Sequence, residues 1–226
     1  NLFDDTNNKE NEVFKFDSLK EWTKKELLAE EFKSLGFYIS DHPLNEYKEF
    51  FTQLEINSYK DFIDGEKSES LVAGTIMSIQ EKKSAKGNSY AIVKFTDNKS
   101  EFEIFLFSDL FSSNREKLKE SNSFILTLHK DKNINENNVA RVSVKKIIDL
   151  VDLVNKTYES VSIELNNKEK LKELNELLNK NGKTKINVIL KDRNKNYNFE
   201  LQKTRKFDFD LFSLIKNKEY VRKIVF

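Results

Sequence analysis

The residues most able to do chemistry lie between positions 82 and 107, where lysines and aromatic residues are interleaved. Lysine ammonium groups contact phosphates and aromatic rings stack on bases, so this combination indicates a site for a nucleic-acid strand. Each stacked ring contributes about 1–3 kcal/mol to binding. The predicted contacts in this stretch are Lys82, Lys83, Lys86, Tyr90, Lys94, Phe105 and Phe107.

A second basic group follows further along the chain. The group comprises Lys130, Lys132, Arg141, Lys145 and Lys146, of which Lys130, Lys132 and Arg141 are predicted as additional contacts. Asp131 and Glu136 lie nearby and weaken their field. If this group belongs to a loop on the same rim as the first group, the two loops could clamp a strand between them.

Another interpretation of these residues stays open. Lys and Asn are abundant throughout the chain, so the lysines could form an ordinary solvated turn. Phe105 and Phe107 could pack beneath a neighbouring domain, because their spacing alone does not tell exposure from burial.

Strands must position these side chains. Between Leu71 and Phe107, three runs carry apolar residues at every second position, which predicts a strand meander. A helical insert over 108–119 and strand-like runs over 123–130 and 138–147 follow. This order predicts a five-stranded Greek-key barrel of the OB type, a class that mostly binds oligomers. The predicted inward sets are Ala73, Thr75, Met77 and Ile79, then Ala91, Val93 and Phe95, then Phe102, Ile104 and Leu106.

A helical arm is expected before the barrel. Its first helix should begin after Asp17 or Ser18 and end at Gly36, and its second should begin at Pro43. The stretch that leads into the barrel contains Gly65, which we expect to act as a hinge.

A small second unit is expected after the barrel. Its predicted order is a strand over 160–165, a helix that stops at Gly182, a strand hairpin, a helix over 209–215 and a last strand. This β-α-β-β-α-β order is that of a split βαβ sandwich. The fold class is therefore α+β, with a tail over 1–16, an arm over 17–65, an OB domain over 66–150 and a C-terminal domain over 156–226.

The composition excludes several classes of site. The chain has 226 residues, no cysteine and two histidines, so we expect neither disulfides nor a metal centre. The net charge of +1 limits any nucleic-acid site to a local patch. We find no Gly-rich phosphate loop, no catalytic constellation and no membrane-length apolar run, so the chain is expected in the cytoplasm.

Residues 21–47, EWTKKELLAEEFKSLGFYISDHPLNEY, closely resemble the segment W…E.L..E.E.LG.YLSGHPL that precedes the OB domain in bacterial DNA polymerase III alpha subunits. Residues 72–97 are similar to the family's V.G.I…..T.KG..MA.V..ED, and residues 102–111 to its.E.VLF.D.F. The chain departs from the family at Asp41, where the family has glycine, and at Ser84 and Ala85 before the loop Lys86-Gly87.

This resemblance implies a C-terminal fragment of a replicative DNA-directed DNA polymerase, with the catalytic carboxylates and a divalent metal, Mg²⁺, upstream. It implies that the barrel binds single-stranded template DNA and that the last domain binds the clamp-loader tau subunit. Asn1, Leu2 and Phe3 would be the last three positions of the family's sliding-clamp (beta) motif, Q-x-[DSN]-[LM]-F.

Two other functions fit the residues. One is an OB module that binds RNA, such as a tRNA anticodon arm. The other is an adaptor that uses the barrel rim for protein contacts and has no nucleic-acid ligand.

Overall fold

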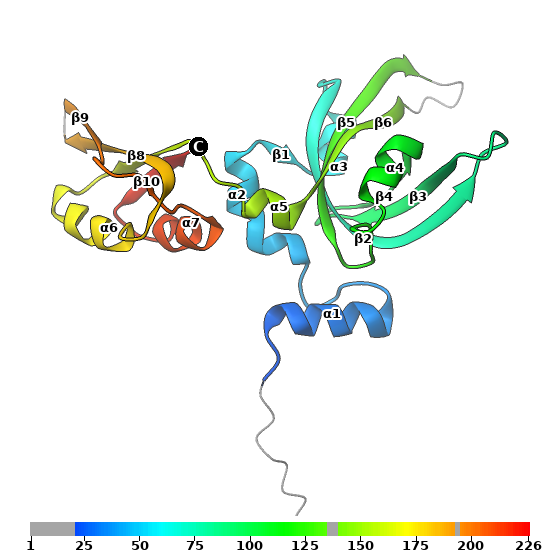
Figure 1. The fold of residues 1–226 in the computed structure, drawn as a ribbon, viewed down its shortest axis with the longest axis horizontal. Coiled ribbons are helices and arrows are strands. Elements are labelled where there is room, and N and C mark those ends of the chain that lie inside the picture. The colour runs from blue at the N-terminus through cyan, green and yellow to red at the C-terminus, as the bar shows by residue number, and fades with distance from the viewer. Residues whose placement is uncertain (1–20, 135–139, 193–194) are drawn as a thin grey trace, which may run out of the picture.

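The computed structural model describes residues 21–134, 140–192 and 195–226 (Figure 1). The described part is mixed α+β, with two sheets and few helices, which confirms the expected class. One sheet carries the predicted meander and the other belongs to the C-terminal unit.

The arm begins with α1 (Lys24–Leu35). Thr23 and Glu26 form a capping box at its start, and Gly36, with φ of 79°, ends it. The predicted end was therefore correct. Asp17 and Ser18, the predicted start, lie outside the described residues, and the described helix begins after Thr23.

The arm continues with a 3₁₀ turn, η1 (Pro43–Tyr47), and α2 (Lys48–Gln53). The turn begins at Pro43 as predicted, and the His42 side chain caps it by accepting a hydrogen bond from the Leu44 amide. A short strand, β1 (Ile56–Asn57), and α3 (Tyr59–Asp64) lead into the first sheet.

The first sheet contains β2 (Glu69–Lys83), β3 (Ser89–Thr96), β4 (Glu101–Leu106), β5 (Ser123–Ile134) and β6 (Ala140–Asp149), with α4 (Ser108–Asn114) between β4 and β5. Its order is β4-β3-β2-β5-β6, and β1 pairs with β2. This is the order expected for a Greek-key OB sheet. Within the described ranges no ladder of hydrogen bonds joins β4 to β6.

The inward faces of β3 and β4 are those predicted, since the alternate residues of both strands are buried. The prediction for β2 was wrong for a specific reason. The register shifts between Ile76 and Ser78, so a bulge at Met77 exchanges the two faces of the strand. Ile76 before the bulge and Ile79 after it pack into the barrel core, while Ala73 faces a second core.

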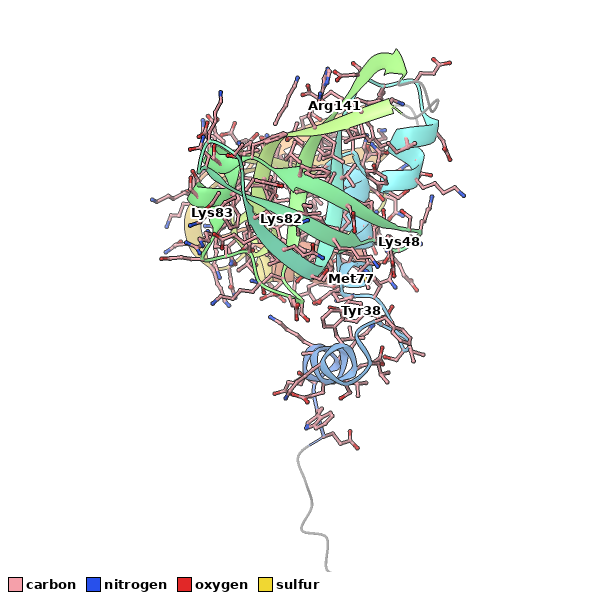
Figure 2. All side chains as sticks on the ribbon, turned by 90° about the vertical axis from the view of Figure 1, so that its right-hand side faces the viewer. Tyr38, Lys48, Met77, Lys82, Lys83 and Arg141 are labelled. Carbon is pink, nitrogen blue, oxygen red and sulfur yellow. The ribbon has the colours of Figure 1, made fainter. Side chains whose placement is uncertain are left out.

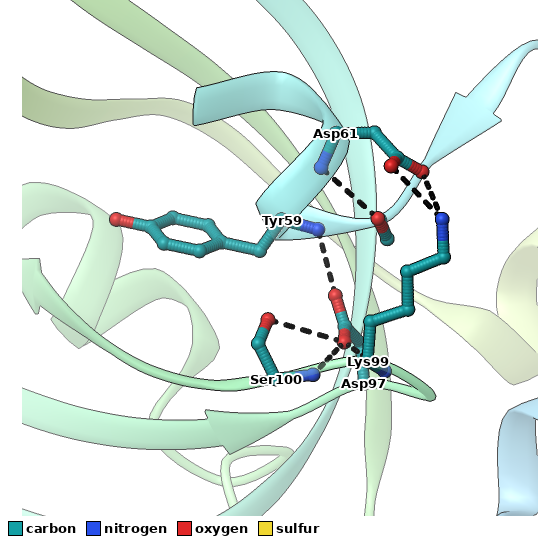
Figure 3. Close-up of polar contacts among 6 residues, drawn as sticks. Tyr59, Asp61, Asp97, Lys99 and Ser100 are labelled. Carbon is teal, nitrogen blue, oxygen red and sulfur yellow. Dashed lines mark hydrogen bonds and ion pairs between the residues drawn. The ribbon is translucent and has the colours of Figure 1, made fainter. Parts of the chain in front are cut away.

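Helix α3 packs on the first sheet and is joined to it by polar contacts (Figure 3). Tyr59 stacks on Phe102, with ring centroids 4.2 Å apart. The buried Asp97 carboxylate accepts hydrogen bonds from the amides of Tyr59, Lys99 and Ser100, each at 2.7 Å. Lys99 also pairs with Asp61 of α3. The residues just before Gly65 are therefore fixed on the first sheet. The hinge expected at Gly65 and in the polar run after it stays a prediction.

The C-terminal unit follows α5 (Leu150–Val154). Its elements are β7 (Ser160–Leu165), η2 (Lys168–Lys170), α6 (Leu171–Leu177), β8 (Asn181–Asp192), β9 (Lys195–Glu200), α7 (Phe209–Lys216) and β10 (Val221–Val225). The element order is the one predicted. The sheet order is β10-β7-β8-β9 with β7 and β8 adjacent and parallel, so the predicted split βαβ arrangement was wrong and the βαβ unit is an ordinary one.

Gly182 does not end the helix as predicted. It lies in β8, where the backbone of the chain approaches so closely that a Cβ atom would lie 2.3 Å from the Lys206 nitrogen. The glycine is needed for this close approach, and α6 ends at Leu177 without it.

Helix α2 joins the two sheets through a common core. Phe50 is 1% exposed, and its ring centroid lies 5.7 Å from that of Phe212 of α7. The ring centroids of Tyr47 and Phe209 lie 4.8 Å apart. The same buried cluster includes Ala73 of β2. Figure 1 shows α2 between the two sheets, so the arm packs on both units. In the ranges described above, no helix combines the length and the apolar character needed to cross a membrane.

Candidate nucleic-acid interface

An aromatic and apolar surface covers the outer face of β3 and β4. Ile92 lies directly opposite Phe105, and residues opposite one another share a face of the sheet. Since the neighbouring pair Ala91 and Leu106 is buried in the barrel, Ile92 and Phe105 must face outward. Phe105 is 50% exposed and Phe107, just after β4, is 56% exposed. We call Tyr90, Ile92, Phe105 and Phe107 the outer platform.

The β2–β3 hairpin places the first lysine group beside this platform. Lys82 lies opposite Tyr90, so the ammonium-bearing side chain and the ring share the outer face. In the turn, the Gly87 amide donates to the Ser84 carbonyl at 2.9 Å. Lys82, Lys83 and Lys86 are exposed, and none of them forms an ion pair with another described residue. Figure 2 shows Lys82 and Lys83 on the same flank of the sheet.

The other end of the platform has no net positive charge. Lys94 pairs with Glu101 at 2.6 Å and lies directly opposite Glu103. Lys94 was predicted as a phosphate contact, but these carboxylates offset its charge. The positive field of the face is therefore concentrated at the hairpin.

Lys130, which was predicted as a nucleic-acid contact, has a structural role in the fold. Its Nζ donates to the carbonyls of Phe62, Ile63 and Gly65 at 3.1, 3.0 and 2.6 Å. It also lies 5.4 Å from the centre of the Phe62 ring. These carbonyls are at the end of α3, where backbone acceptors lack helical partners, so Lys130 caps the helix.

The rest of the second basic group is dispersed. Arg141 is exposed on β6, and Figure 2 places it away from Lys82 and Lys83. Lys132 lies in β5, but its side chain is not among those described. Lys145 pairs with Glu69, and this contact lowers the pKa of the Glu69 carboxyl. The β5–β6 and β2–β3 hairpins nevertheless project to the same side of the sheet in Figure 1.

A pocket that the sequence did not indicate lies where the arm meets the barrel. Its volume is about 520 Å³, and its walls include Tyr38 and His42 of the arm and Met77 of β2. Burial lowers the pKa of His42 and raises that of Tyr38. No periodic signal could have revealed this pocket, because it depends on the bulge at Met77 and on the placement of the arm.

Asn1, Leu2 and Phe3, the predicted clamp-binding residues, lie outside the described residues. Among the residues that the structure does describe, no three His, Cys, Asp or Glu side chains gather closely enough to hold a metal ion.

Comparison with known proteins identifies relatives. No family model matches the chain. The chain is 33% identical over 177 residues to DNA polymerase III subunit alpha of Buchnera aphidicola, covering 74% of this chain and 15% of that protein. It is 26% identical over 146 residues to the same subunit of Pseudomonas fluorescens, covering 65% and 12%. It is 29% identical over 119 residues to the same subunit of Treponema pallidum, covering 50% of this chain and 10% of that protein.

Among solved structures, the chain resembles the mitochondrial single-stranded DNA binding protein Rim1 of S. cerevisiae with a TM-score of 0.31 and 17% identity, over 37% of this chain and 95% of that one. The chain spans about 15% or less of the length of the curated relatives described above. The matched segments correspond to the C-terminal part of those relatives, and the chain belongs to the bacterial DNA polymerase III alpha subunit family, as its sequence predicted.

Proposed function

We propose that this chain binds single-stranded DNA on the outer platform and thereby guides template strand in a replicative DNA polymerase of the cytoplasm. The observation that carries the proposal is the combination of exposed aromatic rings with the lysines of the β2–β3 hairpin, which have no ion-pair partner in the described part of the chain. Base faces stack on the rings and phosphates lie near the ammonium groups. A duplex does not offer free base faces, so the platform favours a single strand.

The remaining parts of the proposal rest on the family. The relatives bear the name of a polymerase subunit, and we propose that nucleotide transfer takes place upstream, where carboxylates hold Mg²⁺. The residues of this chain do not take part in that chemistry. They bind and orient the strand that the active site copies.

We further propose that the chain tethers the polymerase to its partners. Asn1, Leu2 and Phe3 would insert into the sliding clamp, as the resemblance implies. The C-terminal unit would bind the clamp-loader tau subunit. Linkage of several weak contacts raises the overall affinity without any new contact, which suits a polymerase that must remain on its template.

The test is titration of labelled oligo(dT) at several salt concentrations. Removal of one phosphate contact to a single strand lowers the slope of log K against log salt by about 0.7, so the double variant Lys83→Ala, Lys86→Ala should lower it by about 1.4. The control is Lys168→Ala, Lys172→Ala, which removes two exposed lysines of the C-terminal unit. Equal curves for the two double variants would contradict the proposal. Stronger competition by structured tRNA than by unlabelled oligo(dT) would favour the RNA-binding alternative.

A further inference from the structure

The pocket between the arm and the barrel is lined by more polar than apolar side chains. The arm contributes Phe37, Tyr38 and Ile39, and the barrel contributes Met77 and Thr96. With a volume of about 520 Å³ the pocket has the size of a small-ligand site. Phe37 is 50% exposed and Ile39 is 67% exposed, so these two side chains form an accessible rim.

The carboxylates of the pocket are already compensated. Asp41 pairs with Lys24, and Glu101 pairs with Lys94 at 2.6 Å. Asp97 accepts the three backbone hydrogen bonds described above. The pocket therefore offers no free carboxylate to an ammonium group, and none of its lining residues is a lysine or arginine that could hold a phosphate. A neutral group fits it best.

His42 is a neutral group in the wall of the pocket. Its Nδ1 accepts from the Leu44 amide at 3.1 Å, so the proton of the neutral ring must be on Nε2. Burial lowers the pKa of His42, which keeps the ring neutral near pH 7. Nε2 is buried and has no hydrogen-bond partner among the described residues. Because Nε2 has almost no accessible surface, it is not open to a ligand in the pocket.

The pocket is continuous with the outer platform. Thr96 and Glu101 lie opposite one another on β3 and β4. Two residues further along these strands, Lys94 and Glu103 form the next opposite pair on the same face. Residues two apart on a strand share a face, so the surface that carries Phe105 leads to the pocket. A strand that stacks on the platform can therefore reach the pocket with its next bases.

We propose that this pocket holds one unstacked nucleobase of the strand bound on the outer platform. A base is neutral and planar, presents ring faces to aromatic side chains, and has hydrogen-bonding groups on its edge for the polar lining of the pocket. The phosphates stay outside, since no lysine or arginine lines the pocket. This inference rests on the proposed function, because it requires a strand on the platform.

The test is a scan of single abasic positions along an oligo(dT) strand, measured by titration with the whole chain. The shortest strand that binds with full affinity is used, so that the strand cannot slide to avoid the abasic position. Bases on the platform and in the pocket should each give a loss of about fivefold or more. In the variant Phe37→Ala, the loss at one terminal position should disappear while the losses at the platform positions remain.

Leu35→Ala is the matched control, because Leu35 is an exposed arm residue, at 49%, that does not line the pocket. It should keep the wild-type profile. A profile that is the same in Phe37→Ala and wild type overturns the base pocket, leaves the proposed function intact and favours a protein side chain as the occupant. Failure of intact oligo(dT) to bind overturns both proposals.

Discussion

The two basic groups of the chain differ in what their charges do in the folded protein. Lys82, Lys83 and Lys86 stay exposed and unpaired among the described residues. Lys130 instead caps α3, and Lys145 pairs with Glu69. The comparison teaches that a lysine in a sequence is a candidate contact only if the fold leaves its ammonium group free. Each of the following predictions tests this difference.

The largest expected effect is on the stability of the Lys130→Met variant. Methionine keeps the apolar stem but leaves carbonyl groups of Phe62, Ile63 and Gly65 without their donor. Because hydrogen bonds to a charged group contribute about 1.5–3 kcal/mol, the free energy of unfolding should fall by that amount in denaturant titrations. Oligo(dT) affinity of the folded variant should be unchanged. A large loss of affinity with unaltered stability would return Lys130 to the nucleic-acid site.

Phe105→Ala should show the reverse behaviour. Removal of an exposed ring should weaken oligo(dT) binding by about 1–3 kcal/mol while the unfolding midpoint stays close to wild type. Phe199→Ala is the matched control, since Phe199 is a strand residue of the other sheet with 45% exposure. Similar affinities for the two variants would mean that the exposed ring of Phe105 is not a stacking platform.

Arg141→Ala tests whether the second hairpin contributes at all. If Arg141 contacts one phosphate, the salt slope should fall by about 0.7, equally for oligo(dT) and for mixed sequences. A loss restricted to certain bases would indicate that Arg141 contacts a base edge instead.

The smallest expected effect is the decrease in stability at acid pH that is due to His42. This side chain has a hydrogen-bond partner in the fold, and its protonation can be changed by pH. Burial lowers the pKa of His42 in the folded chain, against the opposing effect of Asp97 and Asp41. As the pH falls below about 6.5, the unfolded chain therefore binds more protons than the folded chain, and the free energy of unfolding decreases. Denaturant titrations between pH 7.5 and about 5 should show a weaker decrease in His42→Asn, whose side chain can still cap a helix. Parallel decreases in the two proteins would assign the acid sensitivity to other groups.

Periodicity predicted β3, β4 and the element order of the C-terminal unit, because alternate burial follows directly from strand geometry. It failed for β2, where the bulge at Met77 adds one residue and reverses the pattern. Helix ends were predicted where the cap residue was distinctive, as at Gly36 and Pro43. Gly182 is also a glycine that follows a helical pattern, but its role is to let the backbone of Lys206 approach closely. Only the tertiary fold requires this approach.

In the candidate site, too, features set by a local pattern were predicted and features set by distant contacts were not. The exposure of Phe105 and Phe107 agrees with an alternation that the sequence displays. The role of Lys130 depends on α3, 65 or more residues earlier in the chain, so no local pattern could reveal it. The pocket beside His42 likewise depends on contacts between the arm and β2 that are distant in sequence.

The core that α2 shares with both sheets has a mechanical consequence. Because Phe50 is packed against α7 and the same cluster reaches Ala73 of β2, a rotation of the C-terminal unit would open buried apolar surface. Small rotations should therefore be transmitted to the barrel rather than absorbed between the units. A protein that binds the C-terminal unit would, through the core around α2, set the direction in which the outer platform presents its strand.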